Sequence, residues 1–128
     1  MITKVRSVGV YVSDQQRALE FYRDVLGCEV VADFPMGEGD AAPRCIEVRL
    51  PRDAVNLLLF TPQGQEDRVG TFSNVIFHCE DIEATYDELL ERGVEFPTPP
   101  EQAPWSKWWA VFADPDSNTF GLGLESED

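Results

Sequence analysis

Val8-Gly-Val-Tyr-Val-Ser-Asp14, followed by Ala18-Leu-Glu-Phe-Tyr-Arg-Asp-Val-Leu-Gly27, is the stretch of sequence that says most about the fold. Its first part lies in a valine-rich run, residues 5–12, which predicts a β-strand. In its second part, apolar residues recur at helical spacing over residues 17–26. The glycine that follows is a usual residue for ending a helix, because it adopts the left-handed conformation without strain. The chain is therefore predicted to open with a strand and a helix.

Three more strands are predicted in the first half, at residues 29–34, 44–50 and 55–60. A loop rich in glycine, proline and acidic residues, 35–43, separates the first two and is predicted to form a lip. Phe34 and Phe60, near the ends of two of these strands, are assigned to the core.

The same order of elements recurs in the second half. A strand at residues 74–79 precedes a helix over residues 82–90, and Gly93 ends that helix. Then come a short strand, a proline-rich connection, a strand, a turn and a last strand, at residues 94–96, 97–104, 108–113, 114–118 and 119–124. Chance rarely preserves the order of every element, so we predict two repeats, 1–66 and 67–128, in a single domain.

The chain is strongly acidic, with 24 Asp and Glu against 10 Lys and Arg and a formal net charge of -14. Such a surface repels nucleic-acid phosphates and anionic lipids, which argues against both as partners. It attracts cations, so a cationic ligand is one interpretation of the charge and simple solubility is the other.

Cysteine usage and the N-terminus predict a cytoplasmic location. Cys28, Cys45 and Cys79 are odd in number and lack CxxC spacing, which is typical of reduced thiols. The N-terminus has no signal-peptide pattern, and no apolar run approaches the length of a membrane span.

Further motifs lie in the second half, at Gly93-Val-Glu-Phe96, Pro104-Trp105 and Asp114-Pro-Asp-Ser-Asn118. With the stretch quoted first, they make the chain resemble the vicinal oxygen chelate superfamily of glyoxalases, bleomycin-resistance proteins and extradiol dioxygenases over essentially its whole length. The resemblance implies an α+β fold in which two βαβββ repeats form an incomplete eight-stranded mixed barrel, or cup, with pseudo-twofold symmetry. It also implies a homodimer. It says little about activity, because the scaffold hosts isomerases, lyases, dioxygenases, thiol transferases and metal-free binding proteins.

Metal-using members of that superfamily place His, Gln or Glu on four strands, one on each, inside the cup. Mapped onto this chain, the four positions hold Ser7, Leu58, Asn74 and Gly121. Leu58 and Gly121 have no donor side chain, and the other two are neutral and weak ligands. A shift of two residues in one strand would put Asn56 in place of Leu58, and Asn56 is a poor ligand as well. We therefore expect no metal and no cofactor.

His78, the only histidine, leads the candidate ligand contacts. It lies four residues beyond Asn74, so strand alternation places both on one face. Its counterpart in the first repeat is Tyr11, which shares a face with Ser7. A lone histidine more often has a structural hydrogen-bonding role, and a role as acid, base or ligand contact is the alternative.

Three tryptophans, Trp105, Trp108 and Trp109, lie just before and within a strand of the predicted cup. Aromatic walls stack on planar ligands and hold cations over their faces. Packing in the core or at a dimer interface is the alternative. Alternation directs Trp108 and Trp109 to opposite faces, so at most one of them lines the cavity, and Trp105 is expected at its rim.

Two functions of different classes follow from these residues. The first is a metal-free protein that binds a small molecule, similar to bleomycin-resistance proteins, and sequesters a cationic or aromatic compound. The alternative is a lyase, isomerase or dioxygenase of the same superfamily, and a scaffold used only for dimerisation or regulation is a third reading. The missing metal ligands favour the first over an enzyme. We expect the ligand contacts to be Tyr11, Asn74, His78, Trp105, and Trp108 or Trp109.

Overall fold

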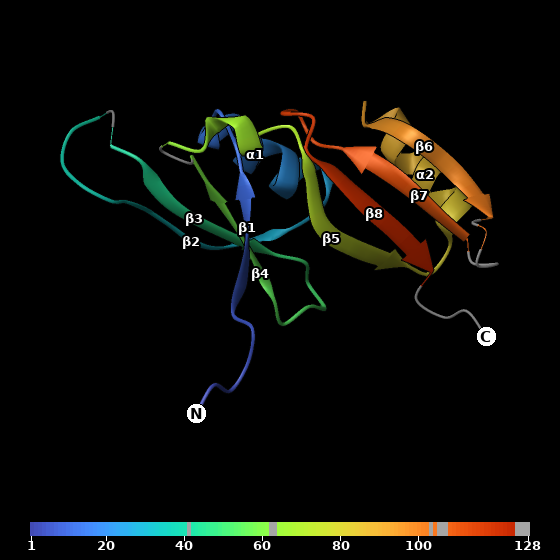
Figure 1. The fold of residues 1–128 in the computed structure, drawn as a ribbon, viewed down its shortest axis with the longest axis horizontal. Coiled ribbons are helices and arrows are strands. Elements are labelled where there is room, and N and C mark those ends of the chain that lie inside the picture. Colours follow the sequence, from blue (N-terminus) through green and yellow to red (C-terminus); the bar gives the residue numbers. More distant parts are fainter. Residues whose placement is uncertain (41, 62–63, 103, 105–107, 125–128) are drawn as a thin grey trace. The chain divides into compact units, whose positions relative to one another are not determined.

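The computed structural model describes residues 1–40, 42–61, 64–102, 104 and 108–124. The chain divides into two compact units, Met1–Val69 and Gly70–Asp128 (Figure 1). Each unit has the order strand, helix and three strands, so the predicted α+β fold with two βαβββ repeats is confirmed. Each contains one open four-stranded mixed sheet. In the described part of the chain, no helix is both long enough and apolar enough to cross a membrane.

The first unit has the sheet order β1-β4-β3-β2, in which β1 runs parallel to β4 and the other neighbours are antiparallel. Its strands are β1 (Ser7–Tyr11), β2 (Glu29–Pro35), β3 (Arg44–Arg49) and β4 (Asn56–Phe60), and its helix α1 (Gln15–Glu20) continues as a π-helical stretch, Phe21–Val25. One face of the sheet packs in the core with the helix. The most deeply buried side chains there are Val10, Val12, Tyr22, Ile46, Val48 and Leu59.

The second unit repeats this topology with the order β5-β8-β7-β6, and β5 runs parallel to β8. Its elements are β5 (Phe72–Cys79), α2 (Ile82–Glu91), β6 (Glu95–Gln102), β7 (Trp108–Ala113) and β8 (Thr119–Leu124). Phe77, Phe112 and Phe120 form the aromatic core under α2, with ring centroids 5.4 to 5.8 Å apart.

Both helices begin in the same way, which reflects the internal repeat. Asp14 caps α1 by accepting a hydrogen bond from the backbone N–H of Arg17, and Asp81 caps α2 by accepting one from Ala84. An aspartate at this position satisfies a backbone donor that the helix itself cannot.

Three expectations from the sequence are wrong. Phe60 is half-buried and lines a cavity, so it does not belong to the core. The other two concern outer strands. Residues 97–102, predicted as part of a connection, belong to β6, whose pairing with β7 shifts register twice. Prolines are tolerated there because an outer strand has one side without ladder hydrogen bonds. Phe34 is 52% exposed and not in the core, because β2 is an outer strand with most of its side chains exposed.

The predicted turn before the last strand is confirmed. Asp114 Oδ1 accepts hydrogen bonds from the backbone N–H groups of Asp116 and Asn118, each 2.9 Å long. Its Oδ2 accepts one from Asn118 Nδ2 at 2.9 Å. Asp114 therefore organises the turn that leads into β8.

Candidate functional site

The face of the second sheet opposite α2 holds two of the residues predicted to contact a ligand, His78 and Trp109. Phe77 of β5 points into the core, where its ring contacts Phe112 and Phe120. Its neighbours Ile76 and His78 alternate with it and are exposed on the other face.

The strand next to β5 in that sheet is β8 (Figure 1), and it contributes two glycines to the same face. Gly123 pairs with His78 of β5 on one side and with Trp109 of β7 on the other. Gly121 pairs in the same way with Ile76 and Val111. We call Gly121 and Gly123 the glycine strip, because the backbone of β8 carries no side chain at these two positions.

His78 lies directly beside this strip. A Cβ atom on Gly123 would be 3.7 Å from His78 Cδ2 and 4.0 Å from His78 Nε2, which is ordinary van der Waals distance. A glycine within a strand weakens the sheet unless something approaches its backbone closely. A Cβ atom on Gly121 would be only 3.1 Å from Ile76 Cγ1, so the Ile76 side chain lies over that glycine. The backbone of the strip is therefore open to a flat ligand at Gly123, between an imidazole and an indole.

The corresponding positions in the first unit are filled. Leu58 and Phe60 of β4 take the places of the two glycines and pair with Gly9 and Tyr11 of β1. A Cβ atom on Gly9 would be 2.6 Å from Phe60 Cε1, so the phenyl ring already occupies the space over that glycine. Tyr11 meets the same ring edge-on, with the centroids 4.7 Å apart.

The other residues predicted from the sequence to contact a ligand do not all lie on this face. Asn74 is exposed with a left-handed φ of 64° and lies where the register of β5 shifts against β8. Trp109 is half-buried on the strip's face, whereas Trp108 alternates to the other side of β7 and is 40% exposed. Trp105 lies outside the described residues. Tyr11 belongs to the first unit.

The donor set at the four positions expected to hold a metal does not fit a divalent ion. Leu58 and Gly121 offer no donor atom, and a catalytic divalent ion needs about three strong ligands. Over the described ranges, His, Cys, Asp and Glu side chains form no group of three or more that could hold a metal ion.

The first unit contains a cavity of about 350 Å³ that sequence reasoning largely missed. It is lined by Tyr11, Gln15, Met36, Pro43, Phe60, Thr61 and Gln65. Met36 and Pro43 come from the loop that was predicted to form a lip. That loop was the one sequence feature that could have indicated a cavity here. Arg68 donates a hydrogen bond to the Tyr11 hydroxyl at 3.2 Å, and its guanidinium lies 5.7 Å from the centre of that ring.

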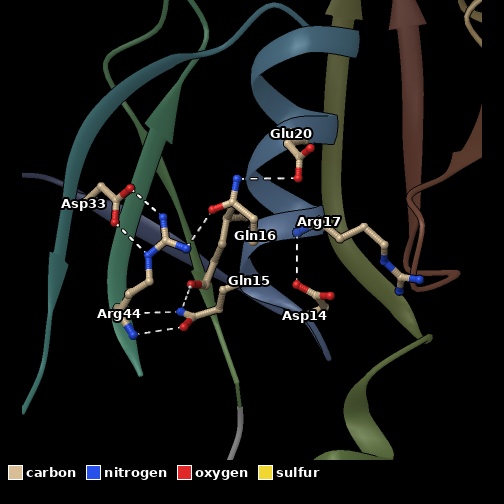
Figure 2. A network of polar contacts seen from close by, with 8 residues as sticks. Asp14, Gln15, Gln16, Arg17, Glu20, Asp33 and Arg44 are labelled. Atoms are coloured by element: carbon tan, nitrogen blue, oxygen red, sulfur yellow. Dashed lines mark hydrogen bonds and ion pairs between the residues drawn. The ribbon is translucent and has the colours of Figure 1, made fainter. Parts of the chain in front are cut away.

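A polar network holds one wall of this cavity in place (Figure 2). Gln15 Nε2 donates to the carbonyl oxygens of Arg44 and Leu59 at 2.6 and 2.9 Å, and its Oε1 accepts from Arg44 N at 2.9 Å. The Arg44 guanidinium donates two hydrogen bonds to Asp33, 3.0 and 2.7 Å long. These bonds lower the pKa of the Asp33 carboxyl below its ordinary value.

Comparison with known proteins assigns the fold to a family. The family model for the Glyoxalase/Bleomycin resistance protein/Dioxygenase superfamily matches residues 4–122. The chain belongs to this superfamily. A superfamily member from Sphaerobacter thermophilus has a crystal structure that is 35% identical, with a TM-score of 0.85 over 97% of this chain and 98% of that one.

Two further relatives have more specific descriptions. TnmS3, described as an antibiotic binding protein from Streptomyces sp. CB03234, is 31% identical with a TM-score of 0.79, covering 98% of each chain. An ethylmalonyl-CoA/methylmalonyl-CoA epimerase of Cereibacter sphaeroides is 31% identical over 100 residues, which is 73% of each chain. Binding proteins and enzymes are thus both similar to this chain.

Proposed function

We propose that the protein binds a planar, positively charged or aromatic small molecule on the glycine strip and needs no metal ion to do so. The observation behind the proposal is the pairing of Gly123 with both His78 and Trp109. Here the ligand ring lies against the backbone of β8 and stacks on the indole of Trp109. Offset or edge-on stacking on an aromatic side chain contributes about 0.5–1.5 kcal/mol beyond the area buried.

The charge of the chain supports a cationic ligand. With a net charge of -14, the surface raises the local concentration of cations, and an indole face attracts a cation directly. Binding should therefore weaken as the salt concentration rises, because salt screens the long-range part of this attraction.

The similarity to TnmS3, a protein described as antibiotic binding, supports a sequestering role. In such a role affinity alone suffices, and no reacting group has to be polarised by a metal. The side chains at the four expected ligand positions agree with this, since only Ser7 and Asn74 among them carry a donor atom. Resistance to a toxic planar compound is the biological outcome that we propose.

A metal-dependent enzyme is the second candidate, and the similarity to the ethylmalonyl-CoA/methylmalonyl-CoA epimerase favours it. In this case an acyl-CoA thioester would bind or react only after a divalent ion is added. The two candidates therefore differ in whether binding requires metal.

The test is isothermal titration calorimetry on protein dialysed against EDTA. The ligands are proflavine as a planar cation, acridone as a planar neutral ring and methylmalonyl-CoA as a thioester. We expect proflavine to bind in the absence of metal and acridone to bind more weakly. Binding or turnover of methylmalonyl-CoA that appears only with added Mn²⁺ or Co²⁺ would support the enzyme instead.

We further propose a cytoplasmic homodimer. The resemblance to superfamily members that pair suggests it, and the outer strand β2 carries the exposed apolar side chains Val30, Val31 and Phe34, 42%, 41% and 52% exposed. Exposed apolar side chains grouped on one strand are typical of an interaction surface. Light scattering after size exclusion would give about twice the 14.4 kDa chain mass if the dimer forms.

A further inference from the structure

Two buried polar side chains are neighbours on the first sheet, apart from the glycine strip. Glu47 of β3 pairs with Leu58 of β4, and Asn56 lies two residues before Leu58, so both side chains are on one face and diagonal to each other. Glu47 is 4% exposed and Asn56 is 7% exposed.

Glu47 has a poor partner for a buried carboxylate. Arg6 Nη2 donates a hydrogen bond to Glu47 Oε2 at 3.0 Å, but the Arg6 side chain is 75% exposed while that of Glu47 is 5% exposed. The backbone of Arg6 is held next to β4, where its carbonyl oxygen accepts a hydrogen bond from Asn56 N at 2.9 Å, but its side chain extends into solvent. A solvated guanidinium offsets little of the cost of burying a carboxylate.

Asn56 is also incompletely satisfied. Its Oδ1 is buried and accepts no hydrogen bond from any described residue. Ser7 of β1 pairs with Asn56 and places its hydroxyl on the same face. Asn56 Oδ1 thus lies without a donor on the same face as the Glu47 carboxylate and the Ser7 hydroxyl, and a buried acceptor usually has a partner.

We propose that Glu47 and Asn56 form a binding site for an amidinium, guanidinium or ammonium group of a small molecule. In the free protein, the guanidinium of Arg6 occupies the place of that group on Glu47. A planar amidinium can donate two parallel hydrogen bonds to the carboxylate of Glu47. A further N–H reaches Asn56 Oδ1. Leu58 and Phe60, next along the same face of β4, provide an apolar surface for the rest of the molecule.

An organic cation fits these residues better than a metal ion. Glu47 is the one carboxylate of the group, and the amide of Asn56 and hydroxyl of Ser7 are weak ligands for a divalent ion. Arg6 already shows the geometry of an N–H donor bound to Glu47.

The test is titration with benzamidine, followed in ¹⁵N–¹H spectra of the full chain, with neutral benzamide as the matched control. We expect benzamidine to shift the amide signals of Ser7 and Leu58 and the side-chain amide of Asn56. Arg6→Ala should tighten the dissociation constant about threefold or more, because it removes the internal competitor. Glu47→Gln should weaken it about tenfold or more.

Three results would overturn the proposal. The first is an unchanged benzamidine affinity in both variants, and the second is equal binding of benzamide. The third is Mn²⁺ binding that excludes benzamidine and disappears in Glu47→Gln. Arg6→Ala keeps the test valid even if Glu47→Gln unfolds, because Arg6 is exposed and outside every strand. The benzamidine experiment does not test the glycine strip, which is in the other unit. Proflavine binding that depends on Trp109 is therefore independent of its result.

Discussion

His78 and Trp109 lie on the same face of the second sheet and pair with the same residue, Gly123, from opposite sides. Three adjacent strands thus present an imidazole, a bare backbone and an indole in one row. The first unit has Phe60 in the place of Gly123, which covers the corresponding backbone with a ring. At this position of the repeat, the two units differ in whether the inner strand carries a phenyl ring or no side chain.

Filling the glycine strip should abolish ligand binding without unfolding the protein. Gly123→Val places a branched side chain where the ligand ring would lie, so proflavine affinity should fall about tenfold or more. Gly123 has no left-handed φ and a Cβ there meets only ordinary contacts, so the strand should accept valine. Calorimetric titration checks the affinity and thermal unfolding checks the fold. Gly123→Ala is the graded control, and full affinity in the valine variant would contradict the assignment.

The turn before β8 should be a major source of stability for the second unit. Asp114 and Asn118 are both buried, and the Asp114 carboxylate accepts two hydrogen bonds from Asn118, one from its backbone N–H and one from Nδ2. Asn118→Ala leaves buried groups unsatisfied and should cost about 2 kcal/mol of unfolding free energy. Urea denaturation measures this. In a double-mutant cycle with Asp114→Ala the losses should be non-additive, and additive losses would show that the two side chains do not act together.

The Cys28 thiol should be unreactive in the folded protein. Burial, with a smaller contribution from the negative charge of Asp53, raises the pKa of Cys28 to about 11. The unfolded chain deprotonates its thiol near the ordinary pKa of about 8.5, so stability should fall as the pH rises from about 8.5 toward 11. Ellman's reagent at pH 8 should therefore label Cys28 only after denaturant is added. Cys28→Ser should flatten the alkaline loss of stability. Rapid labelling of native protein that carries Cys45→Ser and Cys79→Ser would contradict the burial of Cys28.

The ion pair between Asp33 and Arg44 should make stability depend on acidic pH. Arg44 lowers the pKa of Asp33 in the folded state, so the contribution is present above the unfolded pKa of about 3.9. It is lost as the pH falls through the lower folded value. Asp33→Asn should lack this loss, so the difference in melting temperature between wild type and variant should shrink below about pH 4. Asp40→Asn, in the exposed loop after β2, is the matched control and should leave the wild-type pH profile unchanged.

Much of the fold follows from the sequence because each repeat contains a strong helix signal bounded by an aspartate cap and a glycine. Strand periodicity was sufficient to place β3, β4, β7 and β8 within a residue of their observed bounds. It failed at β6, because prolines at 97, 99 and 100 suggest a connection, and only the sheet shows that this strand is an outer one.

The site was harder to predict than the fold. Alternation correctly placed Trp108 and Trp109 on opposite faces, but sequence alone did not reveal that Gly123 is paired with both His78 and Trp109. That relationship depends on the register between paired strands. His78 and Gly123 are 45 residues apart and Trp109 and Gly123 are 14 apart, and local patterns do not encode such pairings. The cavity beside Gln15 was missed for the same reason, since its walls come from two strands, a helix and two loops that are far apart in the sequence.

The most direct test of ligand binding over the glycine strip compares the two neighbouring tryptophans, which lie on opposite faces of β7. The measurement is the dissociation constant of proflavine for Trp109→Ala and for Trp108→Ala, both on EDTA-dialysed protein. We predict a loss of about tenfold or more for Trp109→Ala and no change for Trp108→Ala. The reverse pattern, or equal affinities for both variants and wild type, would contradict the account.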